Sequence, residues 1–323
     1  MNNKAENSLR NSLKIKDTLR NFSLLLVIII MVIALWIVAP VFVSSKNILN
    51  VLRQVSINGI LATGMTFVIL TGGIDLSVGS IIAVSSVIAG NTLAKGQPMI
   101  VAILLSLAAG LVFGLFNGIM ISRFNLPPFI ATLASQTIGS GIALVYSDGK
   151  PFTITNAAFL EIGRGTWLNI PIPIWLLLMV CVCAFILLNF TTFGRYIFAV
   201  GGNEYSTKLS GINTQNIKMT AYIISGILAS LSAMILSSRI SSGQPTSGEG
   251  YELDAIAAVA IGGTSMNGGV GSLSGTVMGF IIIGIISNAL TLLNVSSFYQ
   301  KIVKGVIILV AVIMDMQTKR KEN

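Results

Sequence analysis

Apolar runs of about 20 residues recur along the chain and alternate with shorter polar segments. An α-helix rises about 1.5 Å per residue, so roughly 20 apolar residues cross the ~30 Å hydrocarbon core of a bilayer. We therefore predict an all-α polytopic membrane protein with about ten transmembrane helices. Their expected limits are residues 22–42, 54–71, 77–94, 99–121, 128–147, 173–190, 218–238, 253–270, 273–294 and 300–316.

These runs are expected to form one transmembrane domain, residues 22–316, with polar tails at residues 1–21 and 317–323. The first run follows a basic segment, as the apolar part of a secretory signal does. However, it is longer than such a segment, and no convincing small-x-small cleavage site follows it. We expect an uncleaved first span.

The longest polar interruption in the second half of the chain is residues 194–216, inside a loop placed at residues 191–217. Gly201 and Gly202 predict a sharp turn out of the preceding span. Asn203 predicts the N-cap of a short helix over residues 204–209, and Gly211 predicts its end. A short helix fixed at both ends suits a mechanical contact with another protein. A plain solvated loop is the alternative.

Two further polar segments are expected on the opposite side of the membrane. The longer, residues 147–172, predicts a structured loop with a short amphipathic piece near residues 157–162. The other, residues 239–252, contains Pro245 and three glycines, which exclude a regular helix. Trp167 and Trp175 fall at this predicted interface, the depth that amphipathic rings prefer, although packing against neighbours would also explain them.

Composition and charge agree with a membrane protein. Apolar residues make up 54% of the 323 residues and charged residues only 10%, well below the roughly 25% of soluble domains. The formal net charge of +9 comes from lysines and arginines at span ends, which favours an orientation signal over nucleic-acid binding. The inner segments are richer in these residues if the N-terminus is inside. We expect both termini of the chain to lie in the cytoplasm.

Several chemistries are poorly supported by the sequence. There is no histidine, and Cys181 and Cys183 would point about 200° apart on a helix, so a bond between them is not expected. No G-x-x-x-x-G-K-[ST] motif is present to cradle nucleotide phosphates. An enzyme active site, a metal site and a cofactor bound by this chain are not expected.

A few polar residues fall at membrane depth, where they usually line a cavity or a pathway. Asp75 lies in LTGGIDLSVGS, and Glu252 and Asp254 lie in GYELDAIAAVAIGG. Each is also close to a predicted span end, so capping of a helix N-terminus is the structural alternative for Asp75, Ser77 and Asp254. The candidates for a pathway or gate are Gly72, Gly73, Asp75, Ser77, Glu252, Asp254, Gly262 and Gly263.

Glycines recur every fourth residue in two of the predicted spans, at Gly110, Gly114 and Gly118 and again at Gly275 and Gly279. Small residues at this spacing let membrane helices approach closely. The pattern predicts a compact helical bundle.

The sequence resembles the membrane subunits of bacterial sugar ABC importers of the ribose type, from about residue 42 to the end. The matching stretches are LTGGIDLSVGS, PPFIATLA, GRYIFAVGGNEYSTKLSGIN, GQPTSGEGYELDAIAAVAIGGTSMNGGVGS and NVSSFYQKIVKGVIILVAV. These motifs are long and occur in order. The resemblance implies a transmembrane domain of type II, the kind found in the vitamin B12 importer.

The resemblance also implies partners. They are a second permease subunit (a homodimer is expected), a cytoplasmic ATPase that holds ATP and Mg²⁺, an extracytoplasmic sugar-binding protein and membrane lipid. The residues that the family implies for contact with the ATPase are Gly201, Gly202, Asn203, Glu204, Lys208, Leu209, Ser210 and Gly211. We refer to residues 191–217 as the coupling loop.

The expected function is the ATP-driven import of a sugar, with D-ribose favoured. Another pentose, a hexose or an autoinducer-2-like furanose remains open, because a separate binding protein does most of the selection. An ion-coupled secondary carrier using Asp75 or Asp254 is a second hypothesis, and an assembly scaffold without a pathway is a third.

Overall fold

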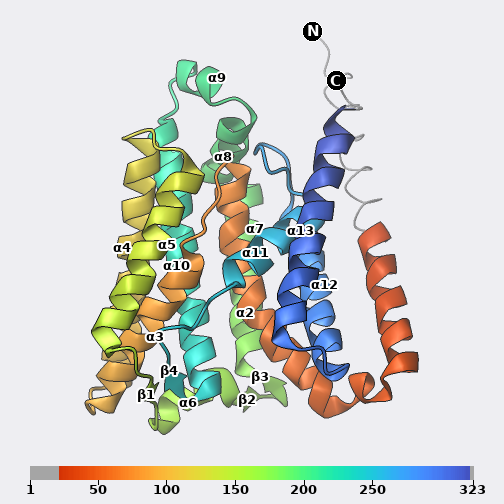
Figure 1. Cartoon of the computed structure of the whole chain (residues 1–323). Coiled ribbons are helices and arrows are strands. Elements are labelled where there is room, and N and C mark those ends of the chain that lie inside the picture. The colour runs from red at the N-terminus through yellow and green to blue at the C-terminus, as the bar shows by residue number, and fades with distance from the viewer. Residues whose placement is uncertain (1–21, 321–323) are drawn as a thin grey trace.

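The computed structural model describes residues 22–320, and it is a bundle of long helices with short strands at one end (Figure 1). The tail at residues 1–21 and residues 321–323 lie outside the described part. The helices are Phe22–Val38, η1 (Pro40–Val43), α2 (Ser45–Leu70), α3 (Val78–Ala94), α4 (Met99–Ser122), α5 (Pro128–Ser147), α6 (Ala157–Arg164), α7 (Ile172–Phe190), α8 (Thr192–Gly202), α9 (Glu204–Leu209), α10 (Thr214–Ile240), α11 (Tyr251–Ile261), α12 (Leu273–Leu292) and α13 (Ser297–Arg320).

Five of these helices, α4, α5, α7, α10 and α12, are long and apolar enough to cross a membrane by length and composition. Phe22–Val38 and α3 are shorter apolar helices. The predicted limits of α3, α4, α5 and α7 are confirmed to within one residue. Helix α2 begins nine residues earlier than expected, at Ser45, where the Ser44 hydroxyl accepts a hydrogen bond from Asn47 N and caps the helix.

The predicted eighth span, residues 253–270, is wrong. Its helical part, α11, has only 11 residues and is therefore about 16 Å long, too short to cross a bilayer alone. Gly262 and Gly263 follow the helix, and Gly263, Gly268 and Gly269 have positive φ values, which end the helix in an irregular loop.

The two ends of the bundle differ. One end carries α9, and helix Phe22–Val38 begins and α13 ends toward that same side (Figure 1). The other end carries the amphipathic helix α6, as predicted, and the two-residue strands β1 (Phe152–Thr153), β2 (Thr166–Trp167), β3 (Ile170–Pro171) and β4 (Ser242–Gly243). Strand β1 pairs with β4 and β2 pairs with β3, both antiparallel.

Helices α2 and α10 form the centre of the bundle. Every residue of α2 from Val55 to Leu70 is buried, and α10 packs against both α2 and α4. The glycines of α4 are the reason that α4 and α10 approach so closely: a Cβ on Gly110 would lie 2.2 Å from the Gly226 carbonyl oxygen. Gly279 of α12 similarly faces the Ala258 carbonyl oxygen of α11. The predicted role of these glycines in helix packing is confirmed.

The segment between α10 and α11, residues 244–250, has no regular helix, as Pro245 and its glycines predicted. It runs along α3, because Gly243 packs on Gly90 and the Gly248 carbonyl oxygen packs on Gly79. From β4 at the α6 end it climbs into the bundle and leads into α11 (Figure 1). Irregular backbone at membrane depth is tolerated where protein buries it or where it lines a cavity.

Candidate functional site

The short helix predicted in the coupling loop is confirmed as α9, with the predicted bounds Glu204–Leu209. The side chain of Asn203 accepts a hydrogen bond from Ser206 N at 2.9 Å and caps its N-terminus. Gly211 ends it with φ +82°, donating its N–H to the Lys208 carbonyl oxygen. Ser210 lies between them as the C-cap. All of these contacts are local, which is why the sequence predicts them.

One face of α9 is held by the bundle and the other is exposed. Thr207 is buried, and Glu204 forms a salt bridge with Lys218 on α10. Tyr205 and Leu209 point away from the bundle, with 73% and 72% of their surface exposed. An exposed apolar pair on a rigidly held helix is a suitable contact for a partner protein.

The predicted turn at Gly201 and Gly202 is wrong, because both residues belong to α8 and complete its last turn. Gly201 is needed for space instead: a Cβ there would lie 1.9 Å from the Leu70 carbonyl oxygen and 2.3 Å from Gly269 N. A Cβ on Gly202 would meet nothing within 4 Å. Only at the first of the two glycines would a side chain therefore collide with neighbouring backbone.

The contact at Gly201 joins the coupling loop to the centre of the bundle. Leu70 is the last residue of α2, and its carbonyl oxygen accepts a 3.0 Å hydrogen bond from Gly269 N in the α11–α12 loop. Gly268 of that loop packs on both Gly72 and Gly201. The end of α8 thus touches the irregular segments that follow α2 and α11.

Asp75 lies in the α2–α3 connection and is fully buried. One carboxylate oxygen accepts hydrogen bonds from Ser77 N and Ser77 Oγ, and the other accepts one from Ser225 Oγ of α10 at 2.8 Å. Asn117 of α4 in turn donates to Ser77 Oγ. The carboxylate therefore ties the start of α3 to α10 and, through Ser77, to α4.

The acidic residues of α11 do not cap it. Gly250 is the N-cap residue and Asp254 instead accepts a 2.8 Å hydrogen bond from Lys304 of α13, so the capping alternative for Asp254 is wrong. Glu252 accepts a hydrogen bond from Gln136 of α5, and its other oxygen has no partner among the described residues. The predicted candidates Gly262 and Gly263 lie at the opposite end of α11, where Gly262 packs on Gly275.

A cluster of three arginines at the α6 end was not singled out from the sequence. Arg53, Arg164 and Arg239 come from α2, α6 and α10 and surround a cavity of about 260 Å³ with Asn50. Arg164 Nε donates to the Arg239 carbonyl oxygen, and within residues 22–320 no acidic side chain pairs with these three. The residues are far apart in sequence, so only the fold brings them together.

Apolar helices packed through glycines, with buried polar breaks inside and a short exposed helix at one end, define a multi-pass membrane protein of the transporter class. The family model described as "Branched-chain amino acid transport system / permease component" matches residues 47–312. The chain belongs to this family of permease components, whose members are transport subunits and not enzymes.

Individual relatives are similar over most of the chain. The ribose import permease protein RbsC of Bacillus subtilis (strain 168) is 50% identical over 88% of this chain and 89% of its own length. RbsC of Haemophilus influenzae is 48% identical over 89% of this chain and 90% of its own length. The L-arabinose transport system permease protein AraH of Escherichia coli (strain K12) is 37% identical, covering 94% and 92%. No solved structure matches the chain.

Proposed function

We propose that this chain is the permease subunit of an ATP-driven importer that moves ribose into the bacterial cytoplasm. The observation that carries the proposal is the identity of 48–50% to two ribose import permeases over nearly the whole chain, against 37% to an L-arabinose permease. The family description names amino acids, but these relatives are named for sugars.

In this proposal the chain spans the inner membrane as one domain, residues 22–316, with α9 and both termini on the cytoplasmic side. Its transmembrane domain is of the type II kind and crosses the membrane ten times. The eighth crossing is composite, made of the irregular segment 244–250 followed by α11. Helix α9 and both ends of the described chain lie toward the same end of the bundle (Figure 1). This arrangement supports placing α9 and both termini on one side of the membrane.

The chain works with three kinds of partner. A second copy completes the pathway, and an ATPase that holds ATP and Mg²⁺ docks on α9. A sugar-binding protein docks at the other end, where Arg53, Arg164 and Arg239, which pair with no acidic side chain of the described part of the chain, would suit acidic residues of a partner. No cofactor and no nucleic acid bind to this chain.

The mechanism rests on the contacts of α8. When the ATPase binds two conformations of the permease with different free energies, it shifts the equilibrium between them. Movement of α9 and α8 would reach the end of α2 and the α11–α12 loop directly, because Gly201 packs on Leu70 and Gly269. Glycine-rich segments at those places can absorb the change in backbone angles.

An ion-coupled carrier is not favoured by the surroundings of the two acids that it would use. Both Asp75 oxygens are engaged by serine groups, and Asp254 is paired with Lys304. A proton or sodium relay needs an acid that can exchange its ion with the pathway.

Uptake into vesicles tests the proposal. The purified permease, ATPase and binding protein are reconstituted, and uptake of radiolabelled ribose and L-arabinose is measured with ATP and without an ion gradient. We expect ATP-dependent ribose uptake that exceeds arabinose uptake. Preferential arabinose uptake would refute the substrate, and uptake driven by an ion gradient without the ATPase would refute the whole proposal.

A further inference from the structure

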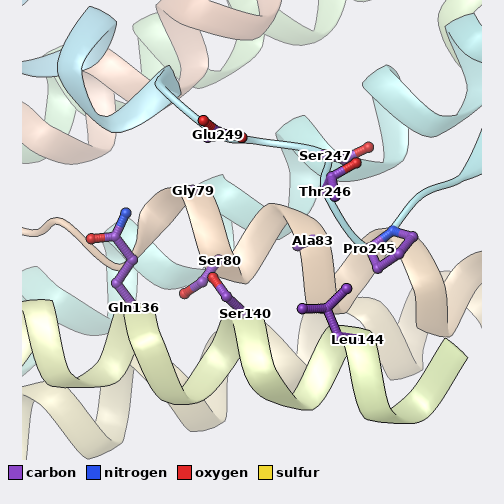
Figure 2. Close-up of a pocket in the computed structure, with 10 residues that line it drawn as sticks. All are labelled: Gly79, Ser80, Ala83, Gln136, Ser140, Leu144, Pro245, Thr246, Ser247 and Glu249. Carbon is purple, nitrogen blue, oxygen red and sulfur yellow. The ribbon is translucent and has the colours of Figure 1, made fainter. Parts of the chain in front are cut away.

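A cavity of about 220 Å³ lies between α3, α5 and the irregular segment 244–250, and polar side chains project into a partly apolar lining (Figure 2). This volume is below the roughly 300–1,000 Å³ of sites for drug-sized ligands, so it suits a smaller molecule. The lining residues are Gly79, Ser80, Ala83, Gln136, Ser140, Leu144, Pro245, Thr246, Ser247 and Glu249. Most of them carry a hydroxyl, an amide or a carboxylate, which is unusual at membrane depth.

Three of the four hydroxyl groups in the lining are available to donate to a ligand, whereas Ser80 Oγ donates to the Ser77 carbonyl oxygen at 2.9 Å and can only accept. Elsewhere on α5, Thr132, Thr137 and Ser147 donate to carbonyl oxygens four residues earlier. Ser140, Thr246 and Ser247 make no such side-chain hydrogen bond with any residue in the described range 22–320. In Figure 2 the side chains of Ser80 and Ser140 lie close together between α3 and α5, and the segment bearing Thr246 and Ser247 runs along α3.

A second observation comes from Glu252, which is nine-tenths buried and lies against two residues of the lining, Gln136 and Gly79. One of its oxygens accepts from the lining residue Gln136. The other has no partner among residues 22–320 and sits over the lining residue Gly79, where an added Cβ would be only 2.4 Å from it. A buried carboxylate oxygen normally has a hydrogen-bond donor, and a ligand hydroxyl could supply it.

The charge of the cavity indicates a neutral ligand. Glu249 is the only charged residue in its lining, and Lys301 of α13 neutralises it through a 2.9 Å salt bridge. An anionic ligand would find no unpaired positive charge in the lining, and the Glu252 oxygen beside it can accept a hydrogen bond from a neutral hydroxyl group. Several hydroxyl and amide groups around a small neutral space are instead suited to a polyhydroxylated molecule.

We propose that this cavity is a low-affinity site for a neutral pentose on its way through the permease, with Ser80, Gln136, Ser140 and Thr246 as the contacting side chains. The inference rests on the proposed function and deepens it. A transport site must bind strongly enough to admit its substrate and weakly enough to release it. Contacts made mainly by hydroxyl and amide groups meet that requirement.

Protection from alkylation tests the site directly. Ser140→Cys is introduced after Cys181→Ala and Cys183→Ala, and the permease–ATPase complex without binding protein is treated with a small maleimide during a ribose titration. We expect ribose to slow the reaction, about twofold at half occupancy since only the empty fraction reacts. Mannitol at equal osmolarity is the control. A rate that does not depend on ribose over its whole soluble range would overturn the proposal.

A filling substitution provides a second test. In the complete transporter, Ser140→Leu should lower ribose uptake at least about tenfold, equivalent to about 1.4 kcal/mol, whereas Thr137→Leu, at an exposed position on the same helix, should not. Normal uptake by Ser140→Leu also overturns the site. If the unaltered transporter imports no ribose, the proposed function itself is wrong. If it imports ribose and Ser140→Leu does so equally well, only the proposed site is wrong.

Discussion

Adjacent glycines at the end of α8 have different surroundings, and the difference matters for how the coupling loop is attached. Gly201 is pressed against the last carbonyl group of α2 and the backbone of the α11–α12 loop, whereas a Cβ added to Gly202 would meet no atom within 4 Å. The sequence indicates that both are flexible turn residues. Only the tertiary structure separates the one that permits close packing from the one that does not.

We expect Gly201→Ala to destabilise the protein by about 1–3 kcal/mol, because backbone atoms of two segments must move to admit the methyl group. Gly202→Ala is the matched control and should change stability little. Thermal unfolding of the two purified variants in detergent checks this difference. Equal melting temperatures would show that the contact at Gly201 does not hold α8 to the bundle.

At the scale of the element, α9 could be predicted from the sequence because its determinants are local. Asn203 caps it, Gly211 ends it, and both act within a few residues of the helix. Helix α11 could not be predicted in the same way. The run at residues 253–270 is apolar enough for a span, and its interruption depends on glycines that pack against α2, α8 and α12.

For the buried acidic residues, the sequence identified the residues themselves but not their hydrogen-bond partners. Asp75, Glu252 and Asp254 were recognisable as polar residues in apolar surroundings. Their partners Ser225, Gln136 and Lys304 were not, since each comes from a helix distant in sequence.

The end of α9 offers a test of its proposed role. Gly211→Pro should uncouple ATP hydrolysis from ribose uptake, because proline fixes φ near −65° and Gly211 has φ +82°. Gly211→Asn should retain coupling, as asparagine tolerates positive φ. Uptake per ATP hydrolysed is measured in the reconstituted transporter. Normal coupling in the proline variant would contradict the role of α9.

The pairing of α11 with α13 makes a further prediction at this scale. Lys304→Met leaves Asp254 buried without its cation and should cost on the order of 3 kcal/mol of stability. Lys150→Met is the control, because the Lys150–Asp148 pair is largely exposed and should contribute little. Adding Asp254→Asn to Lys304→Met should recover part of the loss. Chemical unfolding of the variants measures these differences in stability. Equal effects of the two lysine substitutions would exclude a structural role for the Lys304–Asp254 pair.

At the scale of the whole molecule, the bundle carries α9 at one end and has irregular segments after α2 and α11 in its interior. The packing of Gly201, Leu70, Gly268 and Gly269 connects the two without an intervening layer of side chains. The proposed passage includes the cavity between α3 and α5, and α3 follows the irregular segment that begins after Leu70. Energy supplied at α9 could therefore act on the passage through backbone contacts.

The position of α9 relative to the membrane and the ATPase is the most direct test of this arrangement. Leu209→Cys, in a chain that carries Cys181→Ala and Cys183→Ala, is treated with a membrane-impermeant maleimide in right-side-out and inside-out vesicles. We expect labelling only from the cytoplasmic side, and we expect assembly with the ATPase to block it. Labelling only from the outside, or labelling that the ATPase leaves unchanged, would contradict the claim that the motor acts on this helix.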